Sequence, residues 1–123
     1  MEYDDILKIL LANKDKSFVD RIINKDNYPV LTEDGETTKN IPKYKTYHTH
    51  LMSYVETDGK WDVFPTVLYD GNGQLTKYEP MEAYKHVRKS GNYISFDKEE
   101  DAAIAYNKSA ENNFGKFAMP NEI

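Results

Sequence analysis

The chain has 123 residues, of which 39% are hydrophobic and 30% are charged, and its formal net charge at pH 7 is −5. This length favours one domain with one modest hydrophobic core. The negative charge argues against a dedicated DNA- or RNA-binding protein, which would usually present a basic patch to the phosphates.

Cysteine is absent, whereas tyrosine occurs ten times. The lack of cysteine excludes disulfides and thiolate metal sites and is compatible with a reducing cytoplasm. Tyrosine combines apolar area with a polar tip, which suits interface positions; a coding bias toward Lys, Asn and Tyr is the alternative explanation. The acidic start Met1–Asp5 lacks the basic region of a signal peptide. The longest apolar run, Ile9–Ala12, is too short to span a bilayer, so no membrane partner is expected.

Two short amphipathic helices are predicted at the N-terminus, joined as a helical hairpin. The first covers Tyr3–Asn13 and the second runs from a cap at Asp15 or Ser17 to about Asn24. Their apolar faces are Ile6, Leu7, Leu10 and Leu11 in the first helix, and Phe18, Val19, Ile22 and Ile23 in the second. Pro29 ends helical order. A polar loop is expected over Thr32–Lys45, after a possible short strand at Pro29–Leu31.

A β-hairpin is the clearest local signal, with strands Tyr47–Thr57 and Lys60–Tyr69 around Asp58-Gly59. A two-residue turn pairs Thr57 with Lys60, and this fixes the register of the other residues. The further expected pairs are Tyr54 with Val63, Met52 with Pro65, and His50 with Val67. Both faces of the hairpin carry apolar residues, so both are expected to be covered. Pro65 cannot donate a ladder hydrogen bond, which places its nitrogen at a sheet edge or a bulge.

Two helices and one strand are predicted in the C-terminal half. After a turn at Asp70–Gly73, Pro80 suits the first position of a helix that Gly91 ends. Met81, Tyr84, Val87 and Arg88 follow helical spacing in it. Tyr93–Phe96 is a short strand, and Asp97 with Glu100 forms a cap-like pair for a last helix with an apolar face of Ala102, Ala103, Ile104 and Tyr106. The expected core includes Phe64, Tyr84, Ile94, Phe96 and Ala103.

No catalytic or cofactor motif is evident. His48 and His50 would point to the same side of a strand and could share a metal ion with His86, Asp62 or Glu56, but zinc sites need three or four convergent ligands. The acidic residues Asp97, Glu99, Glu100 and Asp101 could hold a cation or complement a helix dipole, and we favour the second interpretation. The expectation is therefore no enzyme, no cofactor and no metal site.

The order of short motifs resembles a small module that is widespread in bacteriophage genomes, as stand-alone proteins and as a segment of larger virion proteins. The resemblance spans residues 18–106, and this chain departs from it by a longer segment at Thr38–Tyr47 and by the tail after Phe114. The motifs that carry it are Phe18-Val19-x-Arg21-Ile22-x-Asn24, Pro29-Val30-Leu31, Asp34-Gly35, Thr49-His50-x-Met52, Asp58-Gly59-Lys60, Phe64-Pro65-Thr66-Val67, Pro80-x-Glu82-Ala83-Tyr84, Gly91-x-x-Ile94-x-Phe96-Asp97 and Glu100-x-Ala102.

The resemblance implies a phage origin, with a place in the virion and in the host cytoplasm during assembly. The expected function is a non-enzymatic virion structural or assembly accessory protein that docks on a larger particle protein. The expected partners are other virion proteins, with further copies of this chain within the particle as an option. A small phage protein that inhibits a host factor is the alternative, and a hydrolase that uses His48 and His50 is a more distant one. The hypothetical interface residues are Tyr44, Tyr47, Phe114, Phe117 and Met119.

The expected fold class is α+β, in a single domain over residues 1–123. It comprises a helical N-terminal arm (1–27), an α+β core (28–111) and a C-terminal tail (112–123). The core has a central antiparallel β-hairpin with one or two extra short strands, and two C-terminal helices pack on the sheet.

Overall fold

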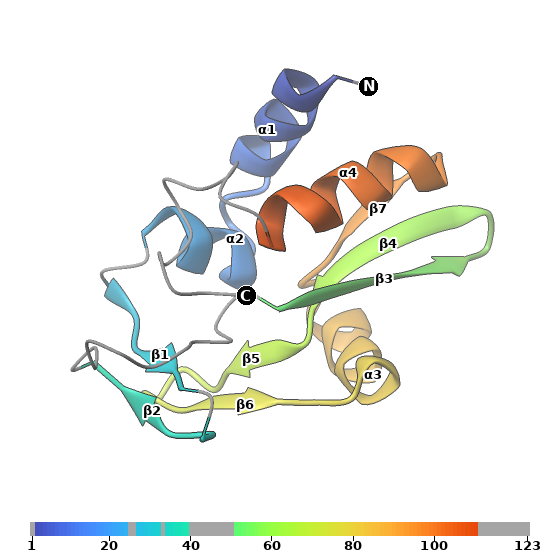
Figure 1. Cartoon of the computed structure of the whole chain (residues 1–123). Coiled ribbons are helices and arrows are strands. Elements are labelled where there is room, and N and C mark those ends of the chain that lie inside the picture. The colour runs from blue at the N-terminus through green and yellow to red at the C-terminus, as the bar shows by residue number, and fades with distance from the viewer. Residues whose placement is uncertain (1, 25–26, 33, 40–50, 111–123) are drawn as a thin grey trace.

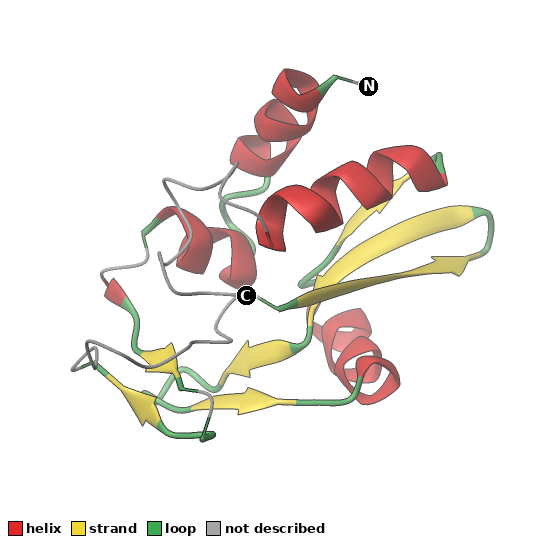
Figure 2. Ribbon diagram, in the orientation of Figure 1, coloured by secondary structure: helices red, strands yellow, loops and turns green. Residues whose placement is uncertain are grey.

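The computed structural model describes residues 2–24, 27–32, 34–39 and 51–110 (Figures 1 and 2). Its elements are α1 (Tyr3–Ala12), α2 (Ser17–Ile23), β1 (Val30–Leu31), β2 (Thr37–Thr38), β3 (Met52–Thr57), β4 (Lys60–Pro65), β5 (Val67–Tyr69), β6 (Leu75–Lys77), α3 (Pro80–Ser90), β7 (Ile94–Phe96) and α4 (Glu99–Ala110). The chain has the expected α+β fold, with two N-terminal helices, antiparallel strands and two C-terminal helices that pack on the β3-β4-β7 sheet.

The β3–β4 hairpin forms around the predicted turn. Asp58 has φ +53° and Gly59 has φ +80°, the two positive values that a type I′ turn requires. The pairs Thr57–Lys60, Tyr54–Val63 and Met52–Pro65 are as the sequence predicts. β7 then pairs with the other side of β4, from Trp61–Phe96 to Val63–Ile94. Pro65 lies beyond the last of these pairs, so its missing N–H falls where β4 has no β7 partner.

The predicted strand Lys60–Tyr69 is wrong in its second half, because the chain changes sheets at Thr66. The Thr66 N–H donates to the Leu51 carbonyl at 2.9 Å, and the Thr66 carbonyl accepts from the Tyr78 N–H at 2.8 Å. Val67 is therefore paired with Lys77 of β6, and its expected partner His50 lies outside the described residues. Pro65 precedes the break and has no N–H to donate on the β7 side, so β7 pairing cannot continue along β4 through this residue. The Asp70–Gly73 turn joins β5 to β6.

The two faces of the three-stranded sheet are buried against different helices (Figure 1). Helix α4 covers one face, where Met52 and Val63 meet Ala102 and Ala105. Helices α1 and α2 add apolar residues to the same core, namely Ile6, Leu10, Phe18, Val19 and Ile22. On the opposite face Phe64 packs against Ala83 and Val87 of α3. The expectation that both faces are covered is confirmed.

Several expected details differ. Residues Thr37–Thr38 form β2 inside the predicted loop, paired with β1. Met81 is 59% exposed, because α3 buries Ala83 and Val87 instead. Tyr84 and Ala103 are half-buried rather than buried. Helix α4 begins at Glu99, and Asp97 pairs with Lys60 of β4 instead of forming the expected cap.

Long-range hydrogen bonds fix the start of α2, which local sequence signals do not reveal. The Phe18 N–H donates to the side-chain oxygen of Asn92 at 3.1 Å, and Lys16 Nζ donates to the Gly91 carbonyl at 3.0 Å. Gly91 itself ends α3 with φ +76°. The end of α3 therefore caps α2, which ties the two halves of the chain together.

Replacing Gly59 by Val should destabilise the protein by about 1 kcal/mol or more, because a β-branched residue is strained at positive φ. Gly59→Asn is the matched control, since Asn tolerates this conformation far better. Urea unfolding of both variants measures the difference. An equal midpoint for Gly59→Val and the wild type would contradict the role of this turn.

Replacing Phe64 by Ala should cost about 3–5 kcal/mol, because the side chain is only 1% exposed and its loss leaves a cavity between β4 and α3. Met81→Ala, at an exposed position of α3, should change stability little. Thermal or urea unfolding followed by circular dichroism compares the two. Similar losses for both variants would argue against this core.

Candidate functional site

The five residues predicted as an interface, Tyr44, Tyr47, Phe114, Phe117 and Met119, all lie outside the described residues, as do His48 and His50. The structure therefore tests neither the docking residues nor the histidine pair. Of the suggested further ligands, Asp62 is buried and Glu56 is exposed. His86 is exposed on α3, where its ring lies 4.7 Å from the ring of Tyr78.

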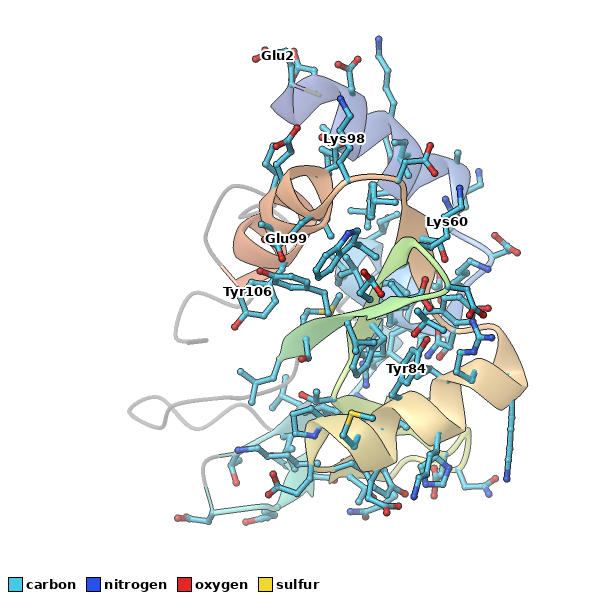
Figure 3. All side chains as sticks on the ribbon, turned by 90° about the vertical axis from the view of Figure 1, so that its right-hand side faces the viewer. Glu2, Lys60, Tyr84, Lys98, Glu99 and Tyr106 are labelled. Atoms are coloured by element: carbon cyan, nitrogen blue, oxygen red, sulfur yellow. The ribbon has the colours of Figure 1, made fainter. Side chains whose placement is uncertain are left out.

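The polar cluster with the most buried centre is built around Asp62, which lies in the middle of β4 on the face that α3 covers. Its side chain is 2% exposed. The carboxylate accepts from the Tyr84 hydroxyl at 2.6 Å and from the Ser95 hydroxyl, and Arg88 Nη1 lies 3.5 Å away. These three partners come from α3 and β7, so one carboxylate connects β4 to both neighbours. Figure 3 shows Tyr84 on the side of α3 that faces the sheet.

Two further residues extend this cluster toward the surface. The Tyr84 hydroxyl lies 2.6 Å from Thr57 Oγ1 at the end of β3, and Arg88 donates to the Tyr93 hydroxyl at 3.1 Å. The Arg88 guanidinium lies over two rings, 5.8 Å from the centroid of Tyr84 and 5.3 Å from that of Tyr93. Such cation–π contacts hold the guanidinium in place while 44% of the side chain stays exposed.

The electrostatics of the cluster suit a structural role. Burial raises the pKa of Tyr84, and its hydrogen bond to Asp62 raises it further. Tyr84 therefore keeps its proton at neutral pH and donates it to the carboxylate. A buried carboxylate is costly unless it is paired and hydrogen-bonded. Here the three partners offset that cost and fix the position of α3 on the sheet.

The cluster lacks the geometry of an activated nucleophile. Ser95 donates directly to Asp62, whereas a triad places an imidazole between the hydroxyl and the carboxylate to take up the proton. Among the described residues, no group of three or more His, Asp, Glu or Cys side chains could hold a metal ion. The acidic residues at the start of α4 do not form such a group either. The arrangement can therefore hold an element in place, but it offers no proton relay.

A second tyrosine–carboxylate pair joins α2 to the region before β1. The Tyr28 hydroxyl donates to Asp20, and the Tyr28 ring packs edge-on against Tyr69 with centroids 5.3 Å apart. Burial and the Asp20 carboxylate raise the pKa of Tyr28 to about 12. Nearby, the buried Arg21 donates to the Val67 carbonyl at 2.6 Å. These contacts attach α2 to β5.

A cleft of about 410 Å³ lies between the start of α2, the end of α3 and β5. Its lining includes Lys16 and Asn92, whose side chains are engaged with Gly91 and Phe18 respectively. The side chains of Lys16 and Asn92 in this lining therefore connect α2 to the end of α3. Over the described residues, no helix is long and apolar enough to cross a membrane.

In comparisons with known proteins, no family model, no curated protein and no solved structure matches the chain.

The sequence pattern placed Asp62 on a partly apolar face of the hairpin but did not predict which side chains hydrogen-bond to its carboxylate. The pairing of Ser95 with Asp62 follows from the β4–β7 register, which links residues 33 positions apart. The Tyr84–Asp62 contact likewise depends on how α3 crosses the sheet. The available signal was an Asp two residues before Phe64 in a strand, since a charged residue on the same face as a large apolar residue requires partners when that face is buried.

Replacing Asp62 by Asn should destabilise the protein by about 2 kcal/mol, because a hydrogen-bonded charged acceptor is lost while the side-chain volume is kept. It should also lower the pKa of Tyr84, since the Asp62 carboxylate raises that pKa. The control Asp97→Asn alters a solvent-exposed ion pair and should leave the urea midpoint almost unchanged. Equal effects of the two substitutions would contradict a structural role for Asp62.

Alkaline pH should weaken the fold through Tyr28. Because the folded-state pKa of about 12 exceeds the ordinary value of 10.0, the contribution is fully present below about pH 10 and is lost as the pH rises toward 12. Urea unfolding at pH 9 and pH 11.5 should show a larger loss for the wild type than for Tyr28→Phe. Asp20→Asn should shift Tyr28 ionisation to lower pH, and identical pH profiles for all three proteins would refute this assignment.

Proposed function

We propose that this chain is a non-enzymatic structural or assembly accessory protein of a bacteriophage virion, and that it acts by docking on a larger particle protein. The observation that carries the proposal is the ordered series of motifs over residues 18–106 that resembles a module of phage proteins. Under this proposal the protein would be in the host cytoplasm during assembly and in the particle afterwards.

The places of the motif residues in the fold support a shared architecture. Phe64 and Val67 are buried, Asp58-Gly59 forms a turn at positive φ, and Pro80 begins α3. Residues at core and turn positions specify a framework, whereas the function of such a framework lies in the surface that it presents. The resemblance therefore supports a phage protein because the motif residues have structural roles in this fold. It does not identify the partner, which exposed residues would recognise.

The polar chemistry of the described residues favours docking over catalysis. The best-buried carboxylate, Asp62, is engaged by Tyr84, Ser95 and Arg88. Docking would use residues that lie outside the described ranges, with Phe114, Phe117 and Met119 as apolar anchors and with Tyr44 and Tyr47 as further interface residues. Aromatic anchors commonly dominate the binding energy of protein interfaces, at about 2 kcal/mol or more each.

Mass spectrometry of purified particles of the encoding phage tests the proposal. A virion component co-purifies with intact particles at a fixed copy number, whereas an assembly accessory is recovered from assembly intermediates. A small protein that binds and inhibits a host factor, the alternative function, is absent from both and is recovered with that factor from infected cells. This last result would overturn the virion assignment.

Deleting residues 114–123 tests the anchors. The expected result is a protein that keeps its circular dichroism spectrum and melting temperature but no longer joins particles. The matched control replaces Met81, an exposed apolar residue of α3, by Ala and should join normally. Normal incorporation of the truncated chain into particles would mean that residues 114–123 are not the docking segment. An unfolded truncated chain would mean that these residues belong to the hydrophobic core.

A further inference from the structure

One long edge of the three-stranded sheet has unpaired backbone groups. The type I′ turn makes Thr57–Lys60 a hydrogen-bonded pair, so Ser53, Val55 and Thr57 direct their N–H and C=O groups at β4. The alternate residues Met52, Tyr54 and Glu56 direct theirs away from β4. Within the described part of the chain no strand pairs with this side of β3, which lies at the margin of the sheet in Figure 1.

In the described part of the chain, the charge of Glu56 is the one common device against strand pairing that this edge carries. Edge strands are commonly protected by short length, by Pro or Lys, or by a bulge. β3 has six residues, pairs with β4 without interruption, and carries Glu56 as its single charged residue. The opposite edge differs, because β7 has three residues and directs the backbone groups of Ser95 alone outward. Among the strands that the structure describes, the sheet therefore has one unpartnered long edge, that of β3.

We propose that the β3 edge binds the β3 edge of a second copy of this chain, antiparallel and centred on Tyr54. Tyr54 would then face Tyr54 of the second copy, and Met52 would face Glu56 at both ends. The pairing joins two three-stranded sheets into one continuous sheet with two-fold symmetry. It does not depend on the proposed phage function.

Self-complementarity of the edge selects a second copy as the occupant. The outward-facing residues Met52, Tyr54 and Glu56 are symmetric about Tyr54, so all three pairs exchange both backbone hydrogen bonds. Centring on Glu56 would oppose two carboxylates, which is destabilising. Centring on Val55 would leave Met52 opposite Asp58 in the turn and would form fewer pairs. The register with the most bonds is thus also free of opposed charges.

The side chains on this edge add to the pairing. Tyr54 is half-buried, and its ring centroid lies 6.1 Å from that of Trp61 and 5.6 Å from that of Tyr106. A second Tyr54 would extend this aromatic group across the two-fold axis, and aromatic cross-strand pairs stabilise sheets. Each copy carries a net charge of −5, so repulsion between copies should make the association stronger at higher salt.

Sedimentation velocity of the full chain over a concentration series is the first test. The wild type should shift from its 14.3 kDa monomer to twice that mass. Glu56→Pro removes an N–H that points away from β4, so it should spare the hairpin and weaken dimerisation at least about tenfold. Glu56→Ala keeps that N–H and loses the same charge, so it should dimerise like the wild type. A wild type that stays monomeric up to about 1 mM overturns the proposal.

Single-cysteine variants test the register, since the natural chain has no cysteine. In the proposed pairing the two Tyr54 Cα atoms lie about 5.5 Å apart, which a disulfide can span. Tyr54→Cys should give a covalent dimer under mild oxidation. Glu56→Cys lies on the same face, but its two copies are offset by four residues, about 14 Å, and should not cross-link.

Equal cross-linking of the two cysteine variants, or none for either, overturns the Tyr54-centred register. Far-UV circular dichroism and the urea unfolding midpoint check that each variant keeps its fold. If Tyr54→Cys is unfolded, the comparison of Glu56→Pro with Glu56→Ala decides the proposal alone. Loss of particle incorporation with dimerisation intact would count against the proposed function and leave this inference standing.

Discussion

The strand β4 is buried on both faces, and this constraint organises the rest of the described structure. Its side chains alternate between two helices, so Val63 enters the core under α4 while Phe64 enters the core under α3. The alternation also buries Asp62 on the α3 side, where an isolated carboxylate would be costly. Tyr84 of α3 and Ser95 of β7 supply the hydrogen bonds that make this position tolerable. The same hydrogen bonds fix the positions of α3 and β7 on the sheet. Two elements are therefore positioned because the buried carboxylate of Asp62 needs hydrogen-bond donors.

Attachment of the N-terminal helices depends on residues far along the chain. The start of α2 is capped by Asn92, and Arg21 bonds to the carbonyl of Val67. A seven-residue helix is too short to be stable alone, so these contacts and the burial of Phe18 and Val19 maintain it. The link from α2 through Asn92 to the end of α3 couples both layers on the sheet. Loss of α3 packing should therefore destabilise α2, although the two helices contribute to hydrophobic clusters on opposite faces of the sheet.

Sequence patterns predicted the elements that depend on local physical chemistry. Asp58-Gly59 needs positive φ at both positions, Pro80 is preorganised for a first helical turn, and Gly91 fits a left-handed cap, so each appears where it was expected. The features that the sequence did not predict depend on long-range contacts. The change of sheet at Thr66 requires knowledge of Tyr78, and the exposure of Met81 follows from the direction in which α3 crosses the sheet. The Asp62 cluster has the same origin, since its partners become neighbours through register alone.

The motifs that suggested a phage protein are largely the residues that specify the framework. Phe18, Arg21, Phe64 and Ala83 are buried, and Gly59 and Gly91 occupy left-handed turns. Residues of this kind are needed by any protein with this architecture, so they carry information about ancestry and fold more than about binding. The residues that distinguish the function of this chain must then be residues that the fold does not require. Such residues lie at exposed strand edges and in segments that depart from the motif series. In the described part of the chain the outer edge of β3 is such a place, because the backbone groups of Met52, Tyr54 and Glu56 point away from β4 whatever side chains these positions carry. The side chains at these positions would then determine which strand could pair with this edge.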